Sequence, residues 1–173
     1  MFNSLKLLFV LAIAVFMLHF HSAHAAQKFT RSQAFGDWVL KCSKDNDPKA
    51  KNSKEKCSLQ QSMVNEKRVR VLAVSIVKVA KRAEKLIVFA LPLGFYLPDG
   101  VKVTVDKGKP RNLLVTNCTQ SGCNARISLD KKLSKELYKG EKLKITLFTG
   151  DRTKKLDFAV SLKGISGGVK AVK

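Results

Sequence analysis

The sequence predicts an all-β domain that folds as an antiparallel sandwich or barrel. Several segments alternate apolar and polar residues with a period of two, which is typical of strands that bury one face. Turn signals separate these segments at short intervals, as they do in sandwiches and barrels. The chain has 173 residues, of which 45% are hydrophobic, so it can bury a core, and its length fits one domain.

The first 25 residues predict a secretory signal peptide. Residues 1–6 are a short basic start, residues 7–18 form an unbroken apolar run, and Ala23, His24 and Ala25 form a small-x-small cleavage pattern. The apolar run is shorter than the roughly 20 residues of a membrane-spanning helix. We therefore expect cleavage after Ala25 and one mature domain of residues 26–173.

The first strands of that domain follow from parity. Trp38, Leu40 and Cys42 lie on one parity, which predicts a strand with one buried face. The segments 69–77 and 86–91 are apolar on both parities and predict central strands covered on both sides.

Four later segments alternate and predict half-buried strands with one wet face. Their inward-facing residues are Val101, Val103 and Val105; Ala125, Ile127 and Leu129; Leu143, Ile145 and Leu147; and Leu156, Phe158, Val160 and Leu162. Turns are predicted at 98–100, 107–110 and 149–151.

One short helix is predicted between two of these strands. Asp130 is a suitable N-cap, Leu133 and Leu137 share one face, and Gly140 ends the helix. Two segments are predicted to be flexible, the lysine-rich loop 43–56 and the tail 166–173.

Cys42, Cys57, Cys118 and Cys123 predict disulfides, because they are an even number in an exported chain. Four cysteines allow three pairings. Cys42 with Cys57 and Cys118 with Cys123 are favoured, since each pair brackets a polar loop between strand-like segments. A zinc site is the rival, but the chain lacks a Cys-x-x-Cys knuckle.

The histidine content argues against catalysis. All three histidines lie within residues 1–25, so the mature chain has no imidazole for general acid or base chemistry or for metal binding. The carboxylates are scattered singly among lysines, except Asp45 and Asp47 in the loop. We expect no enzymatic activity, no cofactor and no metal site.

Positive charge is the main functional signal. The chain has 33 Lys and Arg against 13 Asp and Glu, and only Lys6 is lost with the signal peptide, so the mature net charge is +19. Most of the cations are lysines, which favour diffuse adhesion over a shaped anion pocket. The candidate binding residues fall in four clusters: Lys41, Lys44, Lys49, Lys51, Lys54 and Lys56; Lys78, Lys81, Arg82 and Lys85; Lys131, Lys132, Lys135, Lys139, Lys142 and Lys144; and Arg152, Lys154 and Lys155.

An anionic envelope or host-cell surface is the predicted partner of these clusters. Lipopolysaccharide, an acidic glycan, an acidic lipid and an acidic protein all fit. Nucleic acid is disfavoured, because export removes the usual targets and aromatic residues do not recur beside basic ones. The competing interpretation is that the lysines only keep a β-rich exported protein soluble and protect its sheet edges.

Three aromatic residues have competing interpretations. Trp38 is predicted to pack in the core against a disulfide, because it shares the parity of Leu40 and Cys42. Phe95 and Tyr96 lie between two prolines and are candidates for a partner-binding corner. The favoured interpretation of the segment 91–100 is a corner of the sandwich, because proline cannot donate to a central ladder.

Particular residues resemble a known family. The segment Phe35-Gly36-Asp37-Trp38-Val39-Leu40-Lys41-Cys42, followed by Cys57-Ser58-Leu59, resembles the opening of the invasion-associated locus B family of exported bacterial proteins. The resemblance continues in order through 91–94, 97–101, 108–110, Cys118 with Gly122-Cys123, and 160–164. Together these blocks cover about residues 35–168.

The resemblance implies an immunoglobulin-like β-sandwich in the bacterial envelope and a link to the entry of bacteria into host cells such as erythrocytes. It supplies no catalytic residues. We therefore expect a non-catalytic exported protein, in the periplasm, at the outer membrane or outside the cell, that binds anionic surfaces through its lysines. The alternative is a periplasmic structural or accessory protein, with a protein partner along a sheet edge or at the 91–100 corner.

Overall fold

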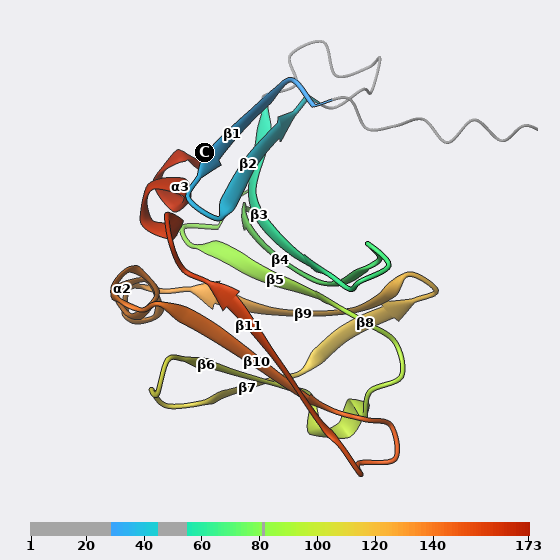
Figure 1. The fold of residues 1–173 in the computed structure, drawn as a ribbon. Helices are drawn as coiled ribbons and strands as arrows, with labels where there is room; N and C mark the ends of the chain where they lie inside the picture. Colours follow the sequence, from blue (N-terminus) through green and yellow to red (C-terminus); the bar gives the residue numbers. More distant parts are fainter. Residues whose placement is uncertain (1–28, 45–54, 81) are drawn as a thin grey trace, which may run out of the picture.

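The computed structural model describes residues 29–44, 55–80 and 82–173, which form two antiparallel sheets (Figure 1). The larger sheet has the strand order β1-β2-β3-β4-β5-β9-β8 and the smaller one β11-β10-β6-β7. The two sheets are separate and pack around a shared core, so the prediction of a β-sandwich is confirmed. The predicted signal peptide and most of the loop 43–56 lie outside the described residues.

The larger sheet is made of β1 (Arg31–Phe35), β2 (Trp38–Ser43), β3 (Lys56–Val64), β4 (Arg70–Lys78), β5 (Lys85–Leu91), β8 (Val115–Thr119) and β9 (Gly122–Leu129). The two segments that are apolar on both parities form β4 and β5, and their predicted position near the middle of the sheet is confirmed. The predicted cover on both faces is not found in β4, where Ser75 and Val77 on the outer face are only half-buried. β1 was not predicted, because four of its five residues are exposed and it shows no alternation.

The smaller sheet is made of β6 (Val101–Val105), β7 (Arg111–Leu113), β10 (Lys142–Phe148) and β11 (Lys155–Ser161). The predicted parity holds in β10, where Leu143, Ile145 and Leu147 are buried. A short 3-10 helix, η2 (Leu97–Asp99), turns the chain between β5 and β6, so the segment 91–100 is a corner of the sandwich.

Helix α2 (Lys131–Lys139) forms where the sequence predicts it. The backbone amide of Leu133 donates to the Asp130 carboxylate over 2.7 Å, which caps the first turn, and the helix ends at Gly140. Leu133 and Leu137 are buried against the rest of the domain.

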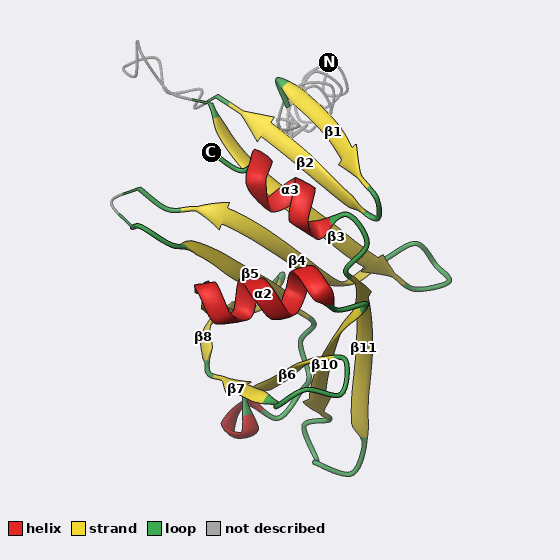
Figure 2. Ribbon diagram, turned by 90° about the vertical axis from the view of Figure 1, so that its left-hand side faces the viewer, coloured by secondary structure: helices red, strands yellow, loops and turns green. Residues whose placement is uncertain are grey.

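The C-terminal residues differ from the prediction. The tail 166–173 was expected to be flexible, but Ile165–Ala171 form helix α3, and Ile165, Val169 and Val172 are buried (Figure 2). Gly168 allows this helix to pack closely. A Cβ atom at this position would lie 2.5 Å from Cδ1 of the buried Leu59, so only glycine lets α3 approach β3 this closely.

Both favoured disulfides are confirmed. Cys42 bonds to Cys57, which are directly opposed in the β2–β3 ladder, and Cys118 bonds to Cys123 in the β8–β9 ladder. The predicted core position of Trp38 is also confirmed, since its side chain is fully buried.

The larger sheet is strongly curved, and its two faces differ in what covers them (Figure 1). Its inner face carries Leu40, Leu59 and Phe89 and belongs to the core that it shares with the smaller sheet and α3. Its outer face is concave over β2, β3 and β4 and opens to the right in Figure 1.

Candidate anionic-surface binding site

Helix α2 presents a row of lysines on the side opposite its buried face. Lys131, Lys135 and Lys139 follow one another at four-residue intervals, which places them on one side of the helix. Leu133 and Leu137 occupy the opposite side and are buried. The packing of two leucines therefore fixes the direction in which three exposed ammonium groups project.

The lysine row borders a groove of about 700 Å³ between α2 and the β4–β5 turn. We call this the α2 groove. Its floor is mainly apolar and is formed by Ala83, Leu129, Tyr138 and Val169. Lys85, at the start of β5, adds a fourth cation to the rim, and Glu84 is the single acidic residue among those that line the groove.

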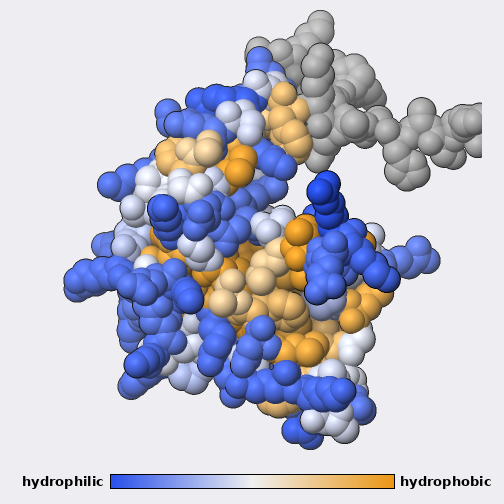
Figure 3. Space-filling model, viewed as in Figure 1, coloured by the Kyte–Doolittle hydropathy of each residue, from blue (hydrophilic) through white to orange (hydrophobic). Residues whose placement is uncertain are grey.

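The α2 groove combines parts of three distant segments of the chain. Lys85 comes from β5, Leu129 from the end of β9, and Val169 from α3, which packs beside α2 (Figure 2). Two clusters that the sequence analysis singled out separately, 78–85 and 131–144, thus meet at one surface. Hydrophilic side chains project from this side of the molecule, at the left of Figure 3.

The carboxylate of α2 does not neutralise the lysine row. Glu136 forms an ion pair with Arg111 of β7 at 2.8 Å. The hydrogen bond from this guanidinium is the main reason that the pKa of Glu136 lies below its usual value, with Coulombic attraction to Arg111 and Lys132 adding to the effect. Because Glu136 is paired with β7, the row on α2 keeps its positive charge.

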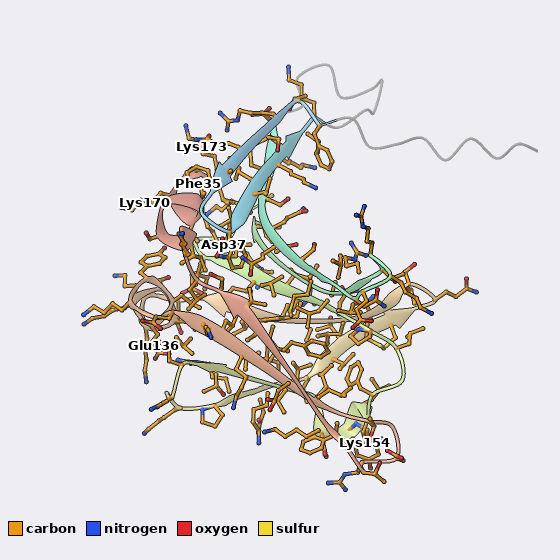
Figure 4. The ribbon with its side chains drawn as sticks, in the orientation of Figure 1. Phe35, Asp37, Glu136, Lys154, Lys170 and Lys173 are labelled. Atoms are coloured by element: carbon orange, nitrogen blue, oxygen red, sulfur yellow. A yellow bond between two sulfur atoms is a disulfide. The ribbon has the colours of Figure 1, made fainter. Side chains whose placement is uncertain are left out.

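The fourth predicted cluster is not part of this groove. Arg152 pairs with Asp99 at 3.3 Å and stacks on the ring of Tyr96 at 4.9 Å, and Lys155 pairs with Asp157 at 3.0 Å. The two contacts of Arg152 hold the β10–β11 turn to the η2 corner, and both ion pairs compensate part of the charge. Lys154 lies at the opposite end of the molecule from Lys170 and Lys173 (Figure 4).

The other predicted lysines are spread over separate surfaces. Lys142 and Lys144 lie on the outer face of the smaller sheet, and Lys132 lines a second hollow with Glu136 and Asp106. Lys41, Lys56 and Lys78 line a cavity on the outer face of the larger sheet, while Lys44 and Arg82 are exposed. Lys49, Lys51, Lys54 and Lys81 lie outside the described residues.

The predicted partner corner is only half available. Phe95 is 6% exposed and pairs with Thr149 through an isolated bridge, so it belongs to the core and cannot bind a partner. Tyr96 is partly exposed and holds Arg152. Beside this corner Leu97, Pro98 and the start of β8 line a groove of about 610 Å³, and Leu114 at its border is 81% exposed.

The apolar floor of the α2 groove escaped the sequence analysis. The sequence predicts Leu129 in the core and Val169 in a flexible tail, so neither residue indicates a binding surface. Tyr138 did carry a signal, because it precedes Lys139 and lies three residues after Lys135, on the lysine side of the predicted helix.

Among the described residues, one group has the composition of a metal site. Ligand atoms of Cys42, Glu55 and Cys57 lie within 4.8 Å of one another. Both sulfur atoms are committed to the disulfide, so they offer no thiolates to a metal ion.

The fold and the groove define a class of protein: a β-sandwich with two disulfides and a lysine-rimmed surface groove. The chain belongs to the invasion-associated locus B (IalB) family, whose model matches residues 38–173. The match extends through α3, where the sequence predicts a flexible tail.

A solved structure has the same fold. The chain is similar to the crystal structure of invasion-associated protein B from Bartonella henselae, with a TM-score of 0.69 and 23% sequence identity over 83% of this chain and 95% of that chain. Comparison with curated proteins gave no match. Within the described part of this chain, none of the helices has the length and apolar character needed to cross a membrane.

Proposed function

We propose that this protein is a non-catalytic exported envelope protein that attaches to anionic lipid surfaces through the α2 groove and takes part in the invasion of host cells, erythrocytes included. Family membership supports the association with invasion. The observation that carries the attachment is the groove itself, in which four lysines rim an apolar floor.

The chemistry of the groove matches an anionic amphiphile. Phosphate or carboxylate headgroups would contact the ammonium groups of Lys85, Lys131, Lys135 and Lys139. Hydrocarbon would cover the exposed Ala83 and Tyr138 and the small areas of Leu129 and Val169 that reach the groove. Each basic residue near an anionic membrane contributes about 1 kcal/mol. Because lysine acts as a point charge, such a surface selects for negative charge more than for one headgroup geometry.

Solubility alone does not account for this arrangement. Lysines that only maintain solubility need no common direction and no apolar surface between them. Here three of them share one side of a helix, and an apolar floor built from three elements lies beside them. Lipopolysaccharide and the anionic lipids of a host membrane both combine negative headgroups with acyl chains and are therefore the favoured targets.

Vesicle binding tests the proposal. The mature chain should co-sediment with vesicles of phosphatidylcholine and phosphatidylglycerol and not with phosphatidylcholine alone, and the bound fraction should fall steeply as salt is raised. The variant K131Q/K135Q/K139Q should lose most of this binding. The variant K102Q/K142Q/K144Q removes the same charge from the smaller sheet and should retain it.

Two outcomes would contradict the proposal. Equal loss in the two triple variants would show that net charge alone drives adsorption, and binding insensitive to salt would exclude a headgroup contact.

The location of the protein is tested by labelling intact cells with a reagent that cannot cross the outer membrane. An invasion factor that touches the host must be labelled by this reagent.

A second candidate function is that of a periplasmic accessory protein, and the groove beside β8 favours it. β8 is the edge strand of the larger sheet, and Leu97 and Leu114 beside it are 48% and 81% exposed. Exposed apolar side chains next to an unpaired strand edge suit a protein partner. A photocrosslinker at position 114 should then give a defined adduct in envelope fractions, and the same probe at position 102 should not.

A further inference from the structure

A second cavity, of about 520 Å³, lies on the concave outer face of the larger sheet. It is lined by residues of β2, β3 and β4 together with Phe29 and is separated from the α2 groove by the β4–β5 hairpin. The concave face opens to the right in Figure 1 and gives the notch on the right-hand outline of Figure 3. We call it the concave cavity.

Strand alternation places polar side chains on the concave outer face of the larger sheet. In the β2–β3 ladder Lys41 is paired with Ser58, and the adjacent pair is Leu40 with Leu59. Leu40 and Leu59 are fully buried on the core face, so Lys41, Ser58 and Gln60 point the other way, into the concavity.

A β-bulge adds an arginine that simple alternation would not place here. Met63 is paired with Leu72, but the next pair is Val64 with Arg70, so β4 contains one extra residue at this point. Without the shift, Arg70 would share the core face of Leu72. Because bulges redirect side chains, Arg70 instead lines the concave cavity.

Four cations line the cavity, Lys41, Lys56, Arg70 and Lys78, and none of the lining residues is acidic. The ammonium groups of Lys41 and Lys78 illustrate how these cations are positioned. Lys41 Nζ lies 5.0 Å from the centre of the Phe29 ring, and Lys78 Nζ donates to the carbonyl oxygen of Ala83 over 2.8 Å. A lysine has three donors, so these contacts position the groups and leave hydrogens for a ligand.

The remaining lining consists of three polar residues, Ser43, Ser58 and Gln60, and three apolar ones, Phe29, Cys57 and Val77, and the cavity surface is polar in its larger part. The Gln60 amide donates to Ser58 Oγ over 2.7 Å, which fixes both side chains on the floor and leaves the Ser58 hydroxyl proton and the Gln60 carbonyl oxygen to face a ligand. Ser43 adds a second hydroxyl at the rim, and Phe29 adds an aromatic ring. The α2 groove, by contrast, has a mainly apolar floor.

We propose that the concave cavity binds an acidic oligosaccharide, one that carries sulfate or carboxylate groups. The cations would contact the acidic groups, the hydroxyl and amide groups would exchange hydrogen bonds with sugar hydroxyls, and the Phe29 ring would cover the apolar face of a sugar ring. The polar floor disfavours an acyl chain, and one aromatic ring provides no stacking platform for successive bases.

The Cys42–Cys57 disulfide braces this site. It joins β2 to β3 at the ladder position next to the Lys41–Ser58 pair, so the two strands that supply most of the lining are covalently linked beside the cavity. The proposal concerns a different surface and a different ligand from the α2 groove and does not depend on lipid binding there.

Titration calorimetry and amide chemical shifts of the mature chain test the site with three probes. A heparin-derived tetrasaccharide supplies sulfate, an oligogalacturonate supplies carboxylate, and a maltooligosaccharide is the neutral control. We expect one or both acidic probes to bind and to shift the amide signals of Ser58 and Gln60. Loss of two charge-assisted contacts in K41Q/R70Q should weaken the affinity about tenfold or more.

The controls separate this site from bulk charge and from the α2 groove. K102Q/K144Q carries the same change in charge and should bind the acidic probe as the wild type does, and K131Q/K135Q/K139Q should do so too. Circular dichroism shows whether each variant is folded, and the shifts of Ser58 and Gln60 in the unmodified chain report the site without any substitution. Equal weakening in K41Q/R70Q and K102Q/K144Q, equal binding of the neutral probe, or acidic probes that leave Ser58 and Gln60 unmoved would overturn the proposal.

Discussion

The indole Nε1 of Trp38 donates a hydrogen bond to the backbone carbonyl oxygen of Ser161, 2.8 Å away. Trp38 begins β2 of the larger sheet and Ser161 ends β11 of the smaller one, so this bond joins the two sheets directly. The two residues lie near opposite ends of the described sequence, so the bond links an early strand of one sheet to a late strand of the other.

Replacing Trp38 with phenylalanine should destabilise the fold. The change leaves the partly buried Ser161 carbonyl oxygen without the Trp38 donor and removes part of a fully buried ring, and we expect the two effects together to cost about 1–3 kcal/mol. Urea unfolding should be followed by circular dichroism and not by tryptophan fluorescence, because Trp38 is the only tryptophan and the variant lacks it. Tyr138→Phe, a change on the surface of α2, should leave the midpoint unchanged; an unchanged midpoint in Trp38→Phe would show that the bond does not matter.

Two neighbouring glycines of α3 should respond in opposite ways to alanine. At Gly168 a Cβ would lie 2.5 Å from Cδ1 of Leu59, which is buried and cannot move freely, so we expect a loss of about 1–3 kcal/mol. At Gly167 the nearest atom is 3.3 Å away on the partly exposed ring of Phe35, and the gain in helix propensity should dominate, by up to about 1 kcal/mol. Thermal unfolding measures both, and equal effects at the two positions would contradict the packing of α3 on β3.

The Asp151 carboxyl group should titrate at an unusually low pH. Hydrogen bonds from the Thr149 hydroxyl, then from the backbone amide and hydroxyl of Thr153, lower its pKa from 3.8 to about 2. The folded state thus prefers the carboxylate, and the turn gains stability above pH 3.8 that is lost as the pH falls through about 2. Carboxyl NMR shifts measure this pKa, and Thr149→Val should raise it; a pKa that stays near 3.8 in the wild type would contradict the turn geometry.

The two disulfides should differ in their contribution to stability. Cys42 and Cys57 are 15 residues apart and Cys118 and Cys123 only 5, so in the chain-entropy model their removal costs about 3 and about 2 kcal/mol respectively. Guanidinium unfolding of C42S/C57S and C118S/C123S measures the difference. The reverse order would mean that contacts in the folded state outweigh loop entropy.

Strand parity predicted much of the fold, because a period of two is a local property. The burial of Leu143, Ile145 and Leu147 in β10 follows from the alternation alone. The bulge at Met63 and Val64 could not be predicted in this way, since it depends on how β3 and β4 pair. Arg70 is not among the predicted binding residues, because those were chosen as clusters along the sequence and Arg70 lies in the segment 69–77 that is predicted to be a central strand.

The candidate sites were predicted in part. The lysine row of α2 follows from helical spacing once Asp130 and Gly140 set the ends of the helix. Its meeting with Lys85 depends on tertiary packing, which no local pattern encodes. The burial of Phe95 and the order in α3 likewise depend on distant partners, Thr149 and Leu59.

The position of the Cys42–Cys57 bond also bears on how the protein would respond to proteolysis. Lys49, Lys51 and Lys54 lie between these cysteines in the sequence, and each is a target for trypsin-like enzymes. A chain cut there would still be held together by the disulfide and by the β2–β3 ladder, and it would divide into two fragments only after reduction. Such a protein could thus be cut between these cysteines and keep its two fragments joined until the disulfide is reduced.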